Sequence, residues 1–349
     1  MRLYTTADAE NYYGGKTAMK KFLAIVLSLV MVFALCATAS AESYTMIVGH
    51  AQPDDNPRNV SLLKFKEDVE AATDGNVTVE IFGAGQLGTE KEMLEQVVAG
   101  TIQGMRGGQF DFSPRLLMFT LPFLTNTREE VTALLKSDLA KKVCAEAEEA
   151  TGTVIINLCD AGGYRQFSTN AHEITKPEDL VGLKMRTNGM KTIDMTFQAL
   201  GANTVSVPYA DLYMSLKTGV ADGQENPWVN VEGMKFYEVQ KYFTEVNYQF
   251  HPDPFYVNAD WWNQLPEEYQ TIIMDAAEAM GDYNDALIDA NSDAAKATIA
   301  ANSTVTELTD EQLQAFKDAV QPVYDQVVAE GICTAEELQE MLDIVASCK

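Results

Sequence analysis

Apolar and polar positions change their spacing repeatedly along the chain. Leu62, Phe65 and Val69 recur at helical spacing and predict one buried face of a helix. The apolar residues between Val77 and Ile81 alternate with polar ones, as in a half-buried strand. A further helix is expected over residues 134–150. Because strand and helix patterns follow one another in this way, the chain is predicted to be an α/β protein with a mainly parallel sheet covered by helices.

A second strand–helix unit is predicted from Gly163 onward, followed by a long Ala-rich helix. This helix begins after Pro266 and runs to about residue 301. Some 35 residues of helix span about 50 Å, more than one small domain needs, so we expect the helix to lie across two lobes. The predicted lobes comprise residues 42–162 with 251–290, and residues 163–250 with 291–349.

Composition narrows the possible functions. The chain has 349 residues, of which 46% are hydrophobic, enough for two domains. The formal charge of −26 argues against a basic face for nucleic acid and against attraction to an anionic membrane. An anionic ligand would meet the same unfavourable field. Its site would therefore have to act locally, through fixed donors in a desolvated cleft.

Residues 1–41 are predicted to be a signal peptide whose true start is Met19. The apolar core, Phe22 to Leu35, is too short to span a bilayer, and Ala39-Ser40-Ala41 is a typical cleavage site. Cys36 leaves lipid anchoring open as an alternative. The protein is therefore expected outside the cytoplasm, with no membrane insertion of the mature chain.

Four cysteines follow the signal, an even number that permits disulfides in an exported protein. Cys144 and Cys159 fall in a helical stretch and a strand, which is typical of buried thiols. The cysteine spacings fit no zinc site, and the chain contains no GxSxG, HExxH or Walker pattern. We expect no enzymatic activity, metal or cofactor from these patterns.

One motif favours a different class of protein. Gly83-x-Gly85-x-x-Gly88 follows a strand and precedes a helix, which is the context of a dinucleotide-binding loop. Asp111 lies near the offset expected for the acid that binds the ribose. The alternative function is therefore an exported oxidoreductase, although nicotinamide cofactors are scarce outside the cytoplasm.

Two arginines are the main candidates for anion binding. Arg186 ends a short apolar strand, and the carboxyl ends of such strands open onto the ligand cleft in α/β sheets. A guanidinium there can bind a carboxylate through two parallel hydrogen bonds, although a plain salt bridge is the alternative. Arg165 follows a pair of glycines, and its sequence context fits ligand binding and a structural role in a crossover strand equally well.

Further candidates follow from the segments around these arginines. Glu225 and Asn226 form an acid–amide pair in a predicted tight turn fixed by Pro227, and the amide can both donate and accept. Trp228 either walls the pocket or belongs to the core. His50 starts the loop between the first strand and the first helix, so it is expected to overlook the cleft.

Six segments in order resemble the dicarboxylate-receptor (DctP) family of TRAP transporter solute-binding proteins, over essentially the whole mature chain. They are Gln86-Leu87-Gly88, Leu121-Pro122-Phe123, Arg165-Gln166, Gly182 to Arg186, Asp222 to Pro227 and Tyr237 to Lys241. The resemblance implies a periplasmic-binding-protein-like fold that closes on a small organic acid and delivers it to a sodium-driven membrane permease.

The resemblance also assigns roles to residues. It implies that Arg186 binds the ligand carboxylate and that Arg165 and Asn226 line the site. Members of the family that bind sialic acid carry an acidic residue where this chain has Gly108 or Gln109. Sialic acid is therefore not expected, and Gln109 is a candidate contact for a smaller acid.

Overall fold

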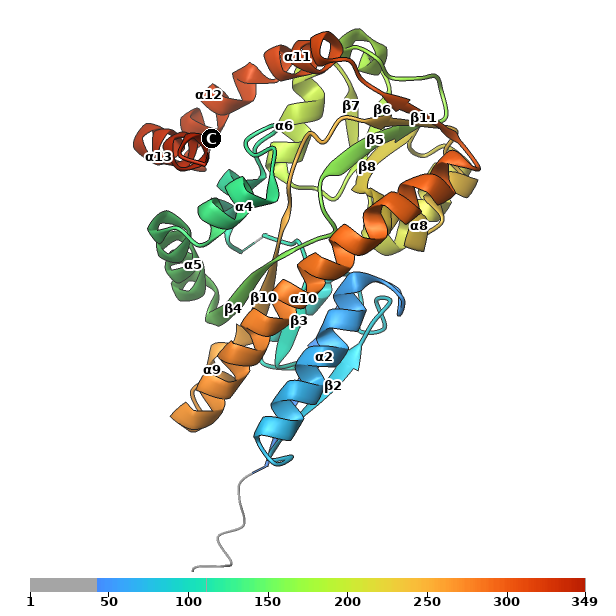
Figure 1. Ribbon diagram of the computed structural model, residues 1–349. Helices are drawn as coiled ribbons and strands as arrows, with labels where there is room; N and C mark the ends of the chain where they lie inside the picture. The colour runs from blue at the N-terminus through green and yellow to red at the C-terminus, as the bar shows by residue number, and fades with distance from the viewer. Residues whose placement is uncertain (1–42, 111, 349) are drawn as a thin grey trace, which may run out of the picture. The chain divides into compact units, whose positions relative to one another are not determined.

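Two β-sheets form the centre of the structure, a computed structural model that describes residues 43–110 and 112–348 (Figure 1). The predicted signal peptide and Asp111 lie outside these described residues. The first sheet has the order β2-β1-β3-β10-β4. Its strands are β1 (Tyr44–Gly49), β2 (Val77–Phe82), β3 (Gly104–Arg106), β4 (Thr153–Asp160) and β10 (Pro252–Asn258). β1 runs parallel to β2 and β3, whereas β10 is antiparallel to β3 and β4.

The second sheet has the order β11-β9-β5-β8-β6-β7. Its strands are β5 (Arg165–Thr169), β6 (Lys184–Thr187), β7 (Asn203–Ser206), β8 (Gly223–Pro227), β9 (Tyr242–Glu245) and β11 (Thr304–Glu307). β6 is parallel to β7 and β8, and β9 is parallel to β11, while β5 is antiparallel to both of its neighbours. The prediction of mainly parallel pairing holds except at β5 and β10, each of which is antiparallel to both of its neighbours.

Side-chain caps begin several of the helices at the positions that the sequence indicates. Asn56 accepts a hydrogen bond from Arg58 N (2.9 Å) at the start of α2 (Pro57–Ala72). Thr89 and Glu92 form a capping box at the start of α3 (Glu90–Val98). α2 buries Leu62, Phe65 and Val69 against the first sheet, as the spacing predicts.

The helix predicted over residues 134–150 is two helices. α4 (Arg128–Leu135) ends at Lys136, and α5 (Asp138–Thr151) starts afresh. Ser137 Oγ accepts a hydrogen bond from Ala140 N (3.1 Å) and so caps the second helix. The hydrophobic spacing continues across this break, which is why it does not reveal the cap.

The predicted tight turn before Trp228 is instead the strand β8. All five of its residues are buried, and it pairs antiparallel with β5, with Asn226 opposite Gln166. The other helices of this region are α6 (Lys191–Ala199), α7 (Leu212–Thr218), α8 (Trp228–Gly233) and α9 (Ala259–Trp262). Four 3-10 helices lie between these elements: Pro114–Thr120, Pro177–Leu180, Tyr209–Asp211 and Phe236–Glu238.

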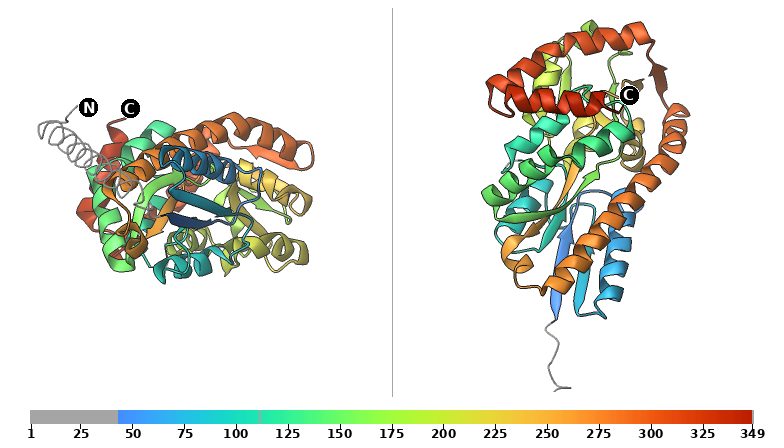
Figure 2. Two further views of the ribbon diagram at one scale, coloured as in Figure 1. Left: turned by 90° about the horizontal axis from the view of Figure 1, so that it is seen from below. Right: turned by 60° about the vertical axis from the view of Figure 1, so that its left-hand side comes forward.

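The long helix α10 (Glu267–Ala300) passes both sheets (Figures 1 and 2). It contacts α2 and β4 of the first sheet region and α8 and β11 of the second. The helix is unbroken at Gly281, where a Cβ would lie 2.8 Å from Asn157 Nδ2. The two-lobed fold with a long helix across both lobes is therefore confirmed, while the residue boundaries of the lobes stay a prediction.

Three helices end the chain: α11 (Asp310–Ala319), α12 (Gln321–Ala329) and α13 (Ala335–Ala346). They lie together at the top of the right-hand view of Figure 2. α12 packs on α6 and α13 packs on α4. Glu337 in α13 accepts hydrogen bonds from Arg115 Nη2 (2.6 Å), Lys142 Nζ (3.0 Å) and Thr334 N (2.9 Å), so it ties α13 to two other elements.

Replacing Glu337 by glutamine is expected to lower the free energy of unfolding by about 2 kcal/mol at pH 7. The Arg115 hydrogen bonds lower the pKa of Glu337 from 4.5 to about 2 against the opposing effect of burial. Because this pKa is depressed, the stabilisation is complete above pH 4.5 and disappears as the pH falls toward 2. Urea unfolding at pH 7 and pH 3 measures the effect, and Glu336→Gln on the exposed side of α13 is the control.

An equal loss of stability at both pH values would show that Glu337 acts through packing rather than through its charge.

Candidate functional site

A small cavity of about 30 Å³ lies between the two sheets. The carboxyl ends of parallel strands point toward it, which is the usual ligand position in α/β sheets. The first sheet and its connections contribute Gln52, Arg58, Glu90, Gly108, Ala161 and His251. The second sheet and its connections contribute Arg165, Arg186, Asn188, Tyr209, Asn226 and Asn230.

Arg186 is the least satisfied charged group of this cavity. It lies near the end of β6 and is 1% exposed. Its Nε donates to Val207 O (2.9 Å), but Nη2 has no hydrogen-bond partner within the described residues. Burial lowers the pKa of Arg186 to about 10, although Glu225 opposes the shift. The guanidinium is still charged at neutral pH, so the cavity holds a buried cation that lacks a direct counter-ion.

Arg165 is held very differently from Arg186. Its Nε and Nη2 both donate to the carboxylate of Glu225, and Nη2 also contacts Asn226 Oδ1 (3.2 Å). Burial alone would lower the pKa of Arg165, but the Glu225 carboxylate outweighs it and the pKa is raised. Tyr248 Oη donates to the same carboxylate (2.7 Å). Arg165 is thus a cavity-lining cation that is already neutralised by a carboxylate, and its part in ligand binding stays a prediction.

Asn226 and Glu225 have different places in the site. Asn226 lines the cavity, and its Nδ2 donates to Gln224 Oε1 (2.6 Å). Glu225 is fully buried and does not line the cavity. Its side chain instead holds Arg165 from behind, an arrangement that β8 makes possible by pairing with β5.

The first sheet supplies charged residues that the sequence did not single out. Arg58 contacts Glu90 through Nη1 (2.8 Å) and Asp253 through Nε (2.9 Å). Arg106 Nε contacts the same oxygen of Asp253 at 2.9 Å. Neither contact with Asp253 has the alignment of a hydrogen bond, so both are ion pairs. Burial raises the pKa of Asp253, while the two guanidinium groups oppose that rise. No short motif marks these residues, because they come from four separate elements.

Besides Glu225, three predicted residues do not line this cavity. His50 is buried beside it, bonded to Asn59 Oδ1 (3.0 Å), and burial together with Arg58 lowers its pKa to about 3. Trp228 is 6% exposed in the core cluster around α8 and borders a different pocket. Gln109 accepts a hydrogen bond from Tyr256 Oη through its backbone oxygen (3.0 Å).

His251 is the main residue that sequence analysis missed. It lines the cavity and is 3% exposed. Burial and Arg165 lower the pKa of His251 well below its ordinary value, so the imidazole is neutral. A Cβ on Gly108 would lie 2.4 Å from His251 Nε2. An acidic side chain at position 108 would therefore require His251 to move.

Residues 48–331 match the family model described as bacterial extracellular solute-binding protein, family 7 (DctP). The chain belongs to this family. It is 30% identical over 310 residues to the C4-dicarboxylate-binding periplasmic protein DctP of Rhodobacter capsulatus, covering 87% of this chain and 92% of that protein.

Two solved structures share the fold of this solute-binding protein. One is a TRAP periplasmic solute-binding protein from Desulfovibrio salexigens with bound orotic acid (TM-score 0.83, 28% identity, covering 88% of this chain and all of that one). The other is the sugar acid binding protein DctPAm from Advenella mimigardefordensis in complex with galactonate (TM-score 0.83, 26% identity, covering 88% and 99%). The predicted family and the solute-binding function are therefore confirmed.

The dinucleotide alternative is wrong for this solute-binding protein. The amides of Ala84 and Gly85 donate to Gln52 O (2.8 Å) and His50 O (3.1 Å), and later amides donate within the loop. A pyrophosphate site needs such amides free to bind the phosphate oxygens. The glycines serve the turn instead, since Gly85 and Gly88 have positive φ angles. Asp111, the proposed ribose acid, lies outside the described residues.

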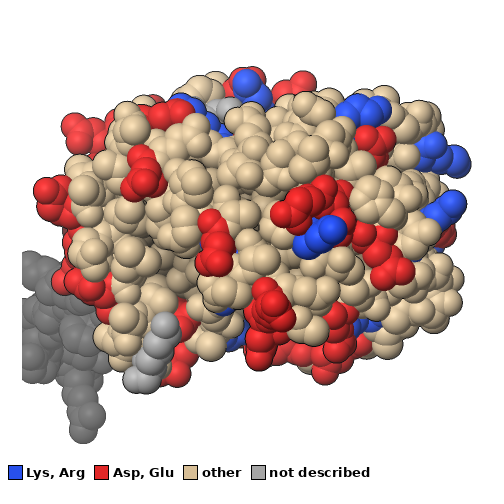
Figure 3. Space-filling view, turned by 90° about the horizontal axis from the view of Figure 1, so that it is seen from above, with Lys and Arg blue, Asp and Glu red and all other residues tan. Residues whose placement is uncertain are grey.

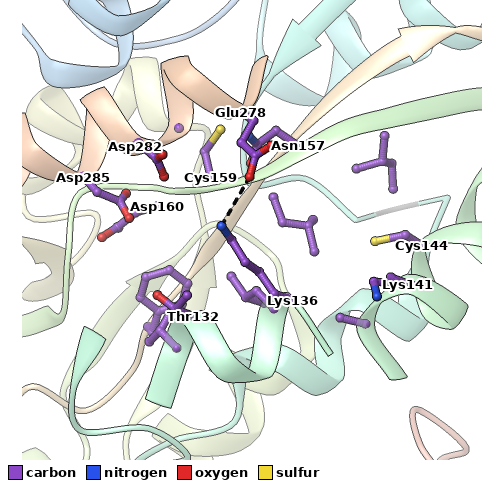
Figure 4. A pocket seen from close by; sticks show the side chains of 17 residues that line it. Thr132, Lys136, Lys141, Cys144, Asn157, Cys159, Asp160, Glu278, Asp282 and Asp285 are labelled. Atoms are coloured by element: carbon purple, nitrogen blue, oxygen red, sulfur yellow. Dashed lines mark ion pairs between the residues drawn. The ribbon is translucent and has the colours of Figure 1, made fainter. Parts of the chain in front are cut away.

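A second cavity lies beside β4, between α4, α5 and α10 (Figure 4). No predicted site residue lines it. Lys136 Nζ lies 3.6 Å from Glu278 Oε1 at its edge. Burial raises the pKa of Cys144 and of Cys159 to about 12, so both thiols in its wall stay protonated and poorly nucleophilic. No arginine among the described residues lines this cavity, in contrast to the cavity at Arg186.

The outer surface differs from the arginine-lined cavity. Acidic side chains are spread over the face shown in Figure 3, in keeping with the acidic excess of the chain. Across the described ranges, no helix is both long and apolar enough to cross a membrane, and no cluster of three metal-ligating side chains is found. The acidic side chains of this face do not favour the approach of an anion.

Proposed function

We propose that this chain is the extracytoplasmic receptor of a TRAP transporter, which captures a small organic acid through its carboxylate and delivers it to the membrane permease. One observation carries the proposal. Arg186 is a buried cation whose Nη2 lacks a partner among the described residues, and it faces a cavity bounded by both lobes. A carboxylate supplies the missing negative charge and two acceptor oxygens at once.

The other predicted residues have supporting roles in this proposal. Asn226 orients the ligand from β8, since its amide is fixed by Gln224 and Arg165. Arg165 adds a second guanidinium to the same wall, and Glu225 sets its position. These residues bind and orient a ligand, and none is placed as a nucleophile or a general base beside a free reaction site. We therefore assign a binding function and no catalysis.

Both lobes are needed to enclose the ligand. Tyr209 Oη donates to Gln52 Oε1 (3.1 Å), and Asn56 Nδ2 donates to Asn230 Oδ1 (3.0 Å). Each contact joins an element beside the first sheet to an element beside the second. Ligand binding would stabilise this closed arrangement, which the permease can then distinguish from an open one.

The export signal completes the proposal. Residues 1–41 have the composition of a signal peptide, and the relative from Rhodobacter capsulatus is a periplasmic protein. We infer that the mature chain begins at Glu42 and acts outside the cytoplasm.

Native mass spectrometry of the protein purified from the extracytoplasmic fraction tests the proposal. The expected spectrum shows a chain that begins at Glu42, together with a co-purified small acid. Addition of NAD or NADP should produce no complex, since the amides of the glycine loop are already bonded. A diacylglyceryl adduct on Cys36 would contradict the cleavage site. A stable dinucleotide complex, or no binding of any carboxylate, would contradict the proposed function.

A further inference from the structure

The charges on the first-sheet wall of the cavity balance one another. Arg58 and Arg106 both contact Asp253 Oδ2 at 2.9 Å, and Arg58 also contacts Glu90 at 2.8 Å. Burial raises the pKa of Asp253, whereas the two guanidinium groups in contact with it favour its ionised form. Arg106 is further bonded to Ser61 Oγ (2.9 Å). Two cations therefore face two carboxylates on this wall, and no cation remains for a ligand.

The second-sheet wall carries one cation more than it can balance. Arg165 is matched by Glu225 through the paired contacts described above. Arg186 donates a hydrogen bond to a backbone carbonyl and has no carboxylate partner among the described residues. Asp160 does not change this balance, because its carboxylate bonds the amides of Gly162 and Gly163 and contacts Arg128 outside the cavity. The charged side chains named on the two walls thus leave one positive charge without a carboxylate, that of Arg186.

The wall opposite Arg186 offers neutral polar groups and a carboxylate. One ring nitrogen of His251 interacts with the backbone of Gly108, and neither ring nitrogen is bonded to a side chain among the described residues, although the residue is only 3% exposed. A neutral imidazole has one donor and one acceptor, which suits a hydroxyl group. Glu90 can accept from a hydroxyl but would repel a second carboxylate.

We propose that the ligand is a hydroxylated monocarboxylic acid, with its one carboxylate on Arg186 and its hydroxyl groups toward Glu90 and His251. This inference rests on the proposed function and names the substrate class of the same site. A dicarboxylate of equal length is disfavoured, because its second charge would lie beside Glu90 with no unpaired cation in reach. The ring nitrogen of His251 that does not face the Gly108 backbone would be left unsatisfied by an aliphatic acid without hydroxyls.

Isothermal titration calorimetry with matched six-carbon probes tests the inference. D-galactonate and galactarate differ only in a terminal hydroxymethyl group against a carboxylate, while hexanoate lacks the hydroxyls and galactitol lacks the carboxylate. D-galactonate is expected to bind at least about tenfold more tightly than galactarate or hexanoate, and galactitol is expected not to bind. Succinate and orotate serve as probes of carboxylate binding in general.

Glu90→Gln connects the selectivity to its proposed cause. Removing this carboxylate should reduce the preference for D-galactonate over galactarate by at least about fivefold. Both affinities are measured on the same variant, so a loss of folded protein cannot produce the change. Glu95→Gln, which removes an exposed charge from the same helix, should leave the preference unchanged.

The outcomes separate the inference from the proposed function. If galactarate or succinate binds as tightly as D-galactonate, or if the Glu90→Gln preference is unchanged, the inference is overturned while the proposed function stands. If hexanoate equals D-galactonate, the role of the hydroxyl groups is overturned. If no carboxylate binds, succinate and orotate included, the proposed function fails and the inference fails with it.

Discussion

Arg186→Ala is expected to weaken binding of the ligand carboxylate by about 2–5 kcal/mol, which corresponds to at least about thirtyfold in Kd. The variant removes the one cavity cation that has no counter-ion among the described residues, so the bound carboxylate would be left buried and unpaired. The ligand-free protein should be as stable as the wild type or more stable, because an uncompensated buried charge is lost. Calorimetric titration and thermal unfolding measure the two effects separately.

Two further variants make this result specific. Arg186→Lys should recover only part of the affinity, because an ammonium cannot form two parallel hydrogen bonds with a carboxylate. Lys184→Ala removes a charge from the exposed end of the same strand and should bind within about threefold of wild type, a difference below about 1 kcal/mol. If Arg186→Ala also binds within threefold, or mainly loses stability, Arg186 is a structural residue and the site is wrongly assigned.

Glu225→Gln is expected to lower the free energy of unfolding by about 3–5 kcal/mol. This change leaves Arg165 buried at 5% exposed without its counter-ion, and it also disturbs the bond from Tyr248 Oη. Urea unfolding of the ligand-free protein measures the loss. Affinity for an anionic ligand should fall less than stability, because the cavity then contains two uncompensated cations instead of one.

Glu245→Gln is the matched control on β9, which lies in the same sheet and is separated from β8 by β5. Its partner is Lys296 at 2.6 Å, and both side chains are about one quarter exposed, at 26% and 24%. An ion pair of this kind contributes about 0–1 kcal/mol. If both variants lose a similar amount of unfolding free energy, burial does not determine how much the Arg165–Glu225 pair contributes to stability. A large drop in affinity with normal stability for Glu225→Gln would place its carboxylate in direct contact with ligand.

These variants distinguish two arginines that look alike in the sequence. Arg165 and Arg186 each lie in a short strand of the second sheet and line the same cavity. One is matched by a carboxylate that is fully buried behind it, whereas the other is not. The two arginines differ in whether a carboxylate lies beside them. Strand pairing determines this, because it decides which side chains of the sheet are neighbours.

Local chemistry allowed much of the fold to be predicted. The capping boxes at Thr89, Thr309 and Thr334 are of this local kind, because each depends on residues three positions apart. The long helix α10 begins after Pro266 as predicted, since the Ala-rich segment has high helix propensity. The family resemblance likewise rests on short contiguous segments. For the same reason, Arg186 and Asn226 could be recognised as candidates from their neighbours along the chain.

Only the tertiary structure determined how the site is charged. The segment Gly223–Pro227 has the glycine and proline of a turn, yet pairing with β5 makes it a buried strand. That pairing places Glu225 against Arg165, 60 residues earlier in the chain, and leaves Arg186 without a carboxylate among the described residues. Arg58, Asp253 and His251 meet at the opposite wall from elements far apart in the sequence. Such contacts depend on burial and long-range packing, whereas capping and periodicity depend on neighbours along the chain, and the sequence by itself reveals only the second kind.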